Sequence, residues 1–106
     1  MATRELAGKI VQVDDQGFMT DPTQWDRDIA RAIAVEEGLS DLTEAHWKLI
    51  DWARETARGS NWRSPTLRQI TKGTAIPTKE TFSLFPKTPA KKAARIAGLG
   101  RPEGCA

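Results

Sequence analysis

Hydrophobic residues are spaced in two ways along the chain, and the spacing changes near residue 20. Residues 9–13 (Lys-Ile-Val-Gln-Val) are β-prone, residues 14–17 (Asp-Asp-Gln-Gly) favour a turn, and Phe18 with Met19 can begin a return strand. Beyond residue 20, apolar residues recur every three or four positions, which is typical of amphipathic helices. The pattern predicts a short N-terminal β-hairpin followed by helices.

The first predicted helix has a start signal and a stop signal. Asp21 before Pro22 is typical of an N-cap followed by the first helical position, and Gln24 can complete a capping box. Gly38 can adopt the left-handed conformation that ends a helix, so we expect this helix at about residues 22–37. The residues expected on its buried face are Trp25, Ile29 and Ile33.

The second predicted helix begins after Thr43, which can cap it, and ends near Gly59. Leu42 and Trp47 occupy the two positions of a hydrophobic staple at its start. We expect His46 to lie at the surface or in the capping region rather than in a catalytic site, because no second histidine accompanies it. A wide apolar stripe on this helix comprises Trp47, Leu49, Ile50, Trp52, Ala53 and Ala57.

Three shorter helices are predicted in the second half of the chain, each opened by a threonine or proline signal and closed by glycine or proline. They are residues 65–72 (after Ser64, ended by Gly73), residues from about 79 to 85 (Phe82 and Phe85 facing inward, ended by Pro86) and a last helix from Thr88 and Pro89 to the cap at Gly98.

These elements predict a mainly α fold, a compact orthogonal bundle of about five helices with a small N-terminal β-hairpin. A chain of 106 residues suffices for one hydrophobic core, so we assign residues 1–98 to a single domain. The side chains expected to share this core are Trp25, Ile29, Ile33, Trp47, Ile50 and Phe85.

Composition narrows the class of protein. Hydrophobic residues (39%) and charged residues (28%) occur at ordinary globular levels. Because no apolar run approaches the roughly 18 residues of a membrane span and the start lacks a signal peptide, we expect a cytoplasmic protein without a membrane partner. We also expect a monomer. Cys105 is the only cysteine and His46 the only histidine, so we expect no internal disulfide, no metal and no cofactor.

Charge is divided unevenly between the two halves of the chain. Residues 1–57 hold six Lys/Arg and twelve Asp/Glu (net −6), whereas residues 58–106 hold ten and two (net +8). This asymmetry is compatible with an ordinary solvated surface. It is equally compatible with a basic face for an acidic protein, a nucleic acid or an anionic substrate.

The C-terminal residues 99–106 contain two glycines and a proline and lack apolar periodicity, which indicates a flexible arm. Seven residues lead from Gly98 to Cys105, enough to extend the thiol by roughly 20 Å. Arg95 and Arg101 could bind and stabilise a thiolate or persulfide anion there. The alternative is that a cysteine at a chain end has no function and that both arginines are surface charges.

Several stretches of the sequence resemble successive motifs of the TusE/DsrC family, in family order. They are residues 17–25 (GFMTDPTQW), 36–38 (EEG), 42–47 (LTEAHW), 67–68 (LR), 84–91 (LFPKTPAK) and 96–99 (IAGL), followed by the penultimate Cys105.

This resemblance implies a stoichiometric sulfur carrier that accepts and donates sulfane sulfur as a persulfide on Cys105. It implies sulfur-donor and sulfur-acceptor proteins as partners, including TusBCD- or DsrEFH-like donors. TusE-like carriers pass sulfur towards transfer-RNA thiolation, whereas DsrC proper works with dissimilatory sulfite reductase and has a second cysteine on its last helix. Ala94 occupies that second position here, so the resemblance implies no intramolecular disulfide cycle.

The chain departs from the family pattern in its short passage from Gly73 to Glu80 and in having no tyrosine. A regulatory or nucleic-acid-binding module is therefore the alternative, with residues 65–72 and 79–85 forming a helix-turn-helix-like basic surface. Only three charges, Arg63, Arg68 and Lys72, surround the first of those helices, which is few for a DNA-binding surface.

Overall fold

The computed structural model describes residues 2–39 and 41–100 and confirms the predicted fold class. Its Cα radius of gyration of 12.5 Å is that of a compact domain of this length. Among the described helices, none is both long and apolar enough to cross a bilayer. The elements, in chain order, are β1 (Ala2–Leu6), β2 (Lys9–Val13), the 3-10 turn η1 (Pro22–Gln24), α1 (Arg27–Glu36), α2 (Glu44–Arg58), α3 (Leu67–Thr74), α4 (Thr78–Leu84) and α5 (Pro89–Ile96).

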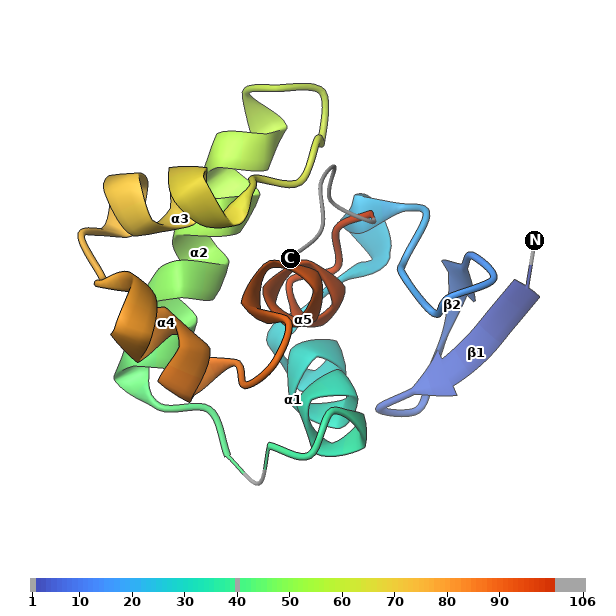
Figure 1. The fold of residues 1–106 in the computed structure, drawn as a ribbon. Helices are drawn as coiled ribbons and strands as arrows, with labels where there is room; N and C mark the ends of the chain where they lie inside the picture. The colour runs from blue at the N-terminus through green and yellow to red at the C-terminus, as the bar shows by residue number, and fades with distance from the viewer. Residues whose placement is uncertain (1, 40, 101–106) are drawn as a thin grey trace.

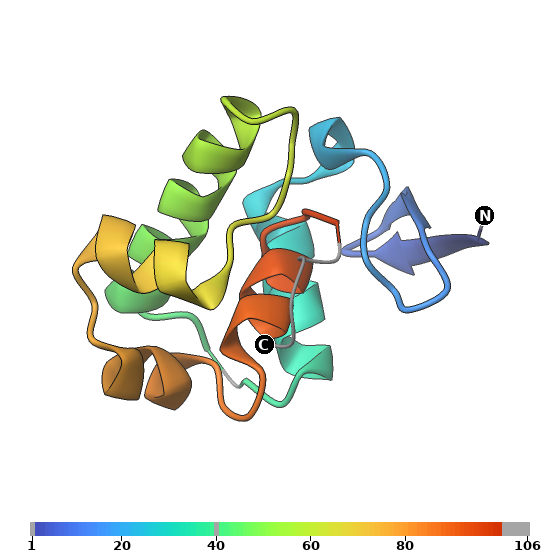
Figure 2. The same ribbon diagram turned by 45° about the horizontal axis from the view of Figure 1, so that its top comes forward.

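Helix α5 lies at the centre of the bundle and contacts α1, α2, α3 and α4 (Figure 1). Its sequence allows this position because the small side chains of Ala90, Ala93 and Ala94 are almost fully buried and let neighbouring helices approach closely. The hairpin lies on the opposite side of the molecule from α3 and α4 in both ribbon views (Figure 2).

The N-terminal hairpin exists, but the predicted strand pairing is wrong. Strand β2 pairs with β1, from Ala2 opposite Val13 to Leu6 opposite Lys9. Ala7 and Gly8 form the connection with φ angles of 53° and 77°, the left-handed backbone that two-residue hairpin turns require. The expected return strand contributes only an isolated bridge between Val13 and Met19.

The predicted helix at residues 22–37 is interrupted after η1. Asp21 caps η1 as expected, but a second cap, Asp26, accepts a hydrogen bond from the Ile29 amide and begins α1. Trp25 lies in extended backbone between the two elements rather than on a helix. The Gln24 side chain accepts from the Gln12 amide (2.9 Å) and joins the hairpin to η1 instead of closing a capping box.

Helix α2 begins and ends where the sequence predicted. Thr43 caps it, and the Thr43 amide donates to Nδ1 of His46 at 3.0 Å, which completes a capping box. Nε2 of His46 lies 2.8 Å from the carbonyl oxygen of Leu84, so these partners require the tautomer with its hydrogen on Nε2. His46 is therefore a buried capping residue that ties α2 to the end of α4.

Helix α3 begins and ends two residues later than predicted. Thr66 rather than Ser64 caps it, in a capping box with Gln69. Gly73 lies inside the helix, beside the indole of Trp52, and the left-handed cap position is taken by Ala75 (φ 61°).

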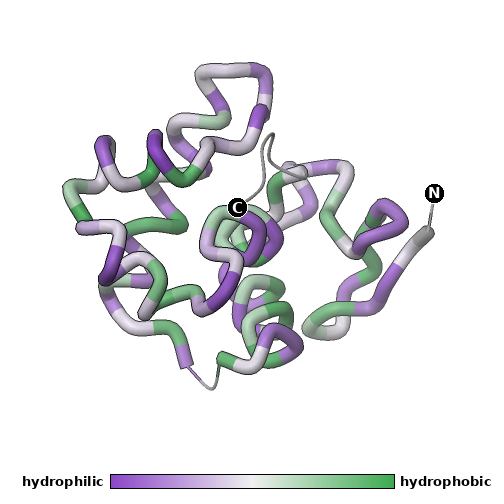
Figure 3. Tube along the Cα trace, in the orientation of Figure 1, coloured by the Kyte–Doolittle hydropathy of each residue, from purple (hydrophilic) through white to green (hydrophobic). Residues whose placement is uncertain are grey.

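The core contains residues of α1, α2, α5 and the hairpin. Hydrophobic and hydrophilic residues alternate along the helices in Figure 3. Ile29, Ile33, Ile50 and Phe85 are fully buried, as predicted, whereas Trp25 and Trp47 are only partly buried against this core. The expectation that Phe82 faces inward is wrong, because 38% of this residue is exposed.

Candidate functional site

The two C-terminal residues singled out from the sequence, Cys105 and Arg101, lie outside the described residues. The described chain ends at Gly100, five positions before the thiol. The candidate site that the structure shows is therefore the segment that directly precedes these residues in the chain. We refer to residues 96–100 as the arm root.

The arm root belongs to the folded domain. Leu99 is 1% exposed, and its amide donates to the Ala94 carbonyl oxygen at 2.9 Å. Ser64 Oγ donates to the Gly100 carbonyl oxygen at 2.5 Å. Leu99 and Gly100, which were assigned to the arm, are thus in contact with the rest of the domain.

Trp25 holds the middle of the arm root. Its indole Nε1 donates to the Ile96 carbonyl oxygen at 2.7 Å. Gly98 has a φ of 71° and lies so close to the indole that a Cβ there would be 2.6 Å from Cγ of Trp25. Gly98 therefore supplies both the predicted helix cap and the space for Trp25.

Arg54 connects the arm root to the start of the first helical segment. Nη1 donates to the Ala97 carbonyl oxygen at 2.8 Å, and Nη2 donates to the Pro22 carbonyl oxygen at 3.0 Å. The guanidinium carbon lies 4.2 Å from the ring centroid of Trp25. Burial, followed by the nearby charge of Arg58, lowers the pKa of Arg54, yet an arginine remains charged at neutral pH.

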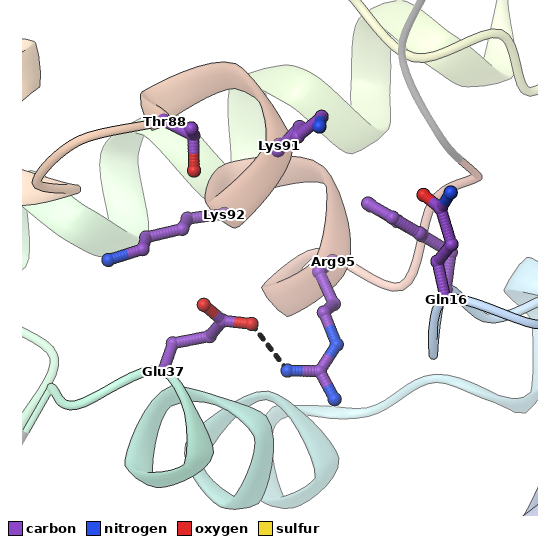
Figure 4. Close-up of a pocket in the computed structure, with 7 residues that line it drawn as sticks. Gln16, Glu37, Thr88, Lys91, Lys92 and Arg95 are labelled. Atoms are coloured by element: carbon purple, nitrogen blue, oxygen red, sulfur yellow. Dashed lines mark hydrogen bonds and ion pairs between the residues drawn. The ribbon is translucent and has the colours of Figure 1, made fainter.

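Arg95, predicted to bind the anionic sulfur, is already engaged with two carboxylates, and Figure 4 shows its contact with Glu37. Nη1 donates to Glu37 (2.5 Å), Nη2 to Glu36 (2.7 Å), and Nε to the Gly17 carbonyl oxygen (3.3 Å). Glu36 also accepts from Arg4 of β1. This network joins the hairpin, α1 and α5. A role of Arg95 towards Cys105 stays a prediction, since it would require exchange of these partners.

A hollow of about 210 Å³ opens beside Arg95. Lys91 and Lys92 line it from α5 and extend in different directions (Figure 4). The hollow has more basic than acidic side chains, and its basic residues all come from α5. Its remaining lining residues are Gln16, Phe18, Glu37 and Thr88.

Ala94, at the position where the resemblance places a second cysteine, is 3% exposed on α5. Its carbonyl oxygen accepts the Leu99 amide, so this residue touches the arm root through its backbone.

Sequence reasoning missed Arg54, although the sequence contains a signal for it. Arg54 stands where the helical spacing of Trp47, Ile50 and Ala57 calls for an apolar residue. A charge in an apolar stripe indicates a buried polar partner, here two carbonyl oxygens. Ser64 was interpreted only as a helix cap, and no local pattern indicates its contact with Gly100, 36 residues later.

Comparison with known proteins gives consistent matches over the whole chain. The family described as DsrC like protein matches residues 5–106. Sulfurtransferase TusE of Yersinia pseudotuberculosis is 36% identical over 108 residues, covering 95% of this chain and 98% of the relative. The gamma subunit of dissimilatory-type sulfite reductase from Nitratidesulfovibrio vulgaris is 34% identical over 105 residues, covering 99% of both chains.

The structural comparison agrees with these matches. The NMR structure of DsrC from Allochromatium vinosum has a TM-score of 0.84 and 35% identity, with 98% of this chain and 97% of that chain covered. Agreement of sequence and fold over nearly the full length confirms the resemblance. The chain belongs to the DsrC-like protein family.

Proposed function

We propose that this protein is a sulfur carrier of a relay pathway and that Cys105 carries the sulfur. The observation that supports this most strongly is the full-length similarity to a sulfurtransferase, TusE, and to a sulfite reductase gamma subunit. Anchoring of the arm root at Gly100 adds support, because it leaves four residues between the last anchored position and Cys105. That spacing would let Cys105 extend about 17 Å into a partner's active site.

The proposed step is an exchange at sulfur. The Cys105 thiolate attacks the outer sulfur of a donor persulfide, a new S–S bond forms, and the donor's S–S bond breaks to release the donor thiolate. Cys105 then holds the outer sulfur with its proton as a persulfide, and an acceptor thiolate removes it by the same exchange. No net oxidation occurs, and the chain needs no cofactor for this step. The reducing cytoplasm is the compartment in which such a free thiol persists.

The test is protein-to-protein transfer followed by mass spectrometry. Wild-type protein incubated with persulfide-charged proteins encoded beside its gene should gain the mass of one sulfur atom at Cys105 and lose it to an acceptor thiol. Cys105→Ser should gain nothing and keep the stability of the wild type. Transfer must exceed loading by a small persulfide reagent, because any exposed thiolate exchanges with such a reagent. Failure of every such donor would overturn the proposal.

A second candidate function, DNA binding, is favoured by one observation. Helices α3 and α4 are joined by only three residues, Ala75–Pro77, in the manner of a helix-turn-helix, and Arg68 and Lys72 are exposed on α3. Salt-dependent binding to duplex DNA that is unchanged in Cys105→Ala would support this function. Absence of binding at low salt would exclude it.

A further inference from the structure

Arg54 is a partly buried cation that serves no ion pair among the described residues. Its donors instead reach two carbonyl oxygens, those of Pro22 and Ala97, which lie far apart in sequence. A desolvated guanidinium is costly to bury unless such acceptors and aromatic faces replace water. Arg54 therefore fixes the start of the arm root against the segment that precedes α1.

Trp62 covers the same guanidinium from a strained loop. Asn61 and Trp62 both have left-handed backbone, with φ angles of 60° and 61°, which is unfavourable for a residue as bulky as tryptophan. The Trp62 amide donates to the Ala57 carbonyl oxygen at 2.7 Å, and the ring centroid lies 5.2 Å from the Arg54 guanidinium carbon. The left-handed turn thus places the indole against Arg54.

The same loop also reaches the end of the arm root. Ser64, two residues after Trp62, donates to the Gly100 carbonyl oxygen. Strained backbone persists where its surroundings hold it and is concentrated at functional sites. Here one strained loop and one partly buried arginine meet the arm root at two points, Ala97 and Gly100.

We propose that Arg54, Trp62 and Ser64 form a positioning clamp that sets where and in which direction the chain to Cys105 leaves the domain. This inference deepens the sulfur-carrier proposal and rests on it for its functional consequence. With the clamp closed, Gly100 is the last anchored residue, and a fully extended chain from it would place the thiol at most about 17 Å away. Release back to Gly98 adds two residues to the free length, about 6 Å of reach, and enlarges the searched volume about 2.5-fold.

The clamp therefore affects delivery to a protein and not the chemistry of the thiol. A small persulfide reagent reaches Cys105 from solution whatever the direction of the chain. A protein donor must receive the thiol in its own active site, so transfer from it depends on the starting point and direction of the arm. This difference separates a positioning role from a purely structural one.

The test compares Arg54→Gln with Arg58→Gln, an exposed arginine one turn later on α2. Two donors are used, rhodanese charged with thiosulfate and glutathione persulfide, at a temperature where all variants are more than nine-tenths folded. Arg54→Gln should load at least tenfold more slowly from rhodanese and at an unchanged rate from glutathione persulfide. Arg54→Lys should recover part of the loss, and Arg58→Gln should match the wild type with both donors.

A second measurement does not depend on sulfur transfer. In ¹⁵N relaxation and amide exchange, Arg54→Gln should raise the mobility of Gly98 and Gly100 and speed exchange of the Leu99 amide at least tenfold. Ser64→Ala, which removes a single hydroxyl, should raise mobility at Gly100 and keeps the test available if Arg54→Gln does not fold.

Unchanged order of the arm root in both variants overturns the clamp, as does equal loading of Arg54→Gln and wild type from rhodanese. If no protein donor loads Cys105 of the wild type, while Arg54→Gln does loosen the arm root, the sulfur-carrier proposal is overturned and the clamp is not.

Discussion

The indole of Trp25 occupies the space beside the Cα atom of Gly98, where a Cβ would lie 2.6 Å from Cγ and 2.7 Å from Cβ of Trp25. The same indole donates to the Ile96 carbonyl oxygen, two residues earlier. A residue before α1 and a residue after α5 therefore fit together only because position 98 has no side chain.

Replacement of this glycine should destabilise the fold. Gly98→Ala combines left-handed backbone, which costs about 1–2 kcal/mol for a residue with a Cβ, with overpacking, which costs about 1–3 kcal/mol. We expect the free energy of unfolding in urea to fall by about 2–5 kcal/mol. Gly100→Ala is the control, because a Cβ there meets nothing within 4 Å. Equal stability of the two variants would contradict the close contact with Trp25.

At position 73, we expect alanine to be less stabilising than glycine, although alanine has the higher helix propensity. In an exposed helix interior, glycine to alanine usually stabilises by about 1 kcal/mol. At position 73, however, a Cβ would lie 2.8 Å from Nε1 of Trp52 and closer still to other ring atoms. We expect Gly73→Ala to lower the free energy of unfolding by about 1–3 kcal/mol.

A double-mutant cycle tests the cause of that loss. Once Trp52→Ala has removed the ring, adding Gly73→Ala should be neutral or stabilising. The same loss in both backgrounds would show that Trp52 is not the obstacle.

Local signals were sufficient to predict most helix boundaries. Thr43 caps α2 through its own turn, and Gly38 and Gly98 both have the left-handed backbone predicted for helix ends. These features depend on residues within four positions of each other, so the sequence determines them directly.

The errors arose where a distant contact or a second local signal prevailed. The hairpin pairs residues 9–13 with the preceding strand because Ala7-Gly8 forms the tighter turn, although Asp14 also closes a turn by accepting from the Phe18 amide. The first helix is interrupted because Asp26 offers a second cap five residues after Asp21. Either reading is compatible with the sequence alone, and tertiary packing selects between them.

The candidate site was predictable only in part. The position of Cys105 near the chain end is visible in the sequence, and Arg54 interrupts an apolar stripe. The contacts from Arg54 to Ala97 and from Ser64 to Gly100 span 43 and 36 residues, and no periodic pattern encodes them.

Phe82 on α4 and Phe85 at its C-terminal end should differ sharply in how much stability is lost when each is replaced by alanine. Phe85 is fully buried and packs edge-on against His46 at a centroid distance of 5.1 Å, whereas Phe82 is 38% exposed. Phe85→Ala should cost about 3–5 kcal/mol in the free energy of unfolding. Phe82→Ala, measured by the same urea titration, should cost less than about 1.5 kcal/mol. A larger loss at Phe82 than at Phe85 would mean that the orientation of α4 is wrong.

Glu36 makes the stability of the fold depend on pH. Its carboxylate accepts from Arg4 of β1 and from Arg95 of α5. Hydrogen bonding from Arg4, assisted by Arg95, lowers the pKa of Glu36, and partial burial opposes this shift. Because the folded-state pKa lies below the unfolded value of about 4.3, the contribution of Glu36 is fully present above that value. It is lost as the pH falls through the folded-state pKa.

We therefore expect the free energy of unfolding, followed by tryptophan fluorescence in urea, to stay level above about pH 5.5 and to decline below about pH 4.5. Glu36→Gln cannot bind the proton, so it should be less stable at pH 7 and should decline less steeply in acid. The stability of Glu36→Gln should still fall somewhat in acid, because the pKa of Asp26 is also lowered, chiefly by its hydrogen bond with Lys9. Glu55→Gln, which removes an exposed partner of Arg58, should keep the slope of the wild type. If the free energy of unfolding falls equally steeply in acid for the wild type and Glu36→Gln, then Arg4 and Arg95 do not stabilise the ionised carboxylate of Glu36.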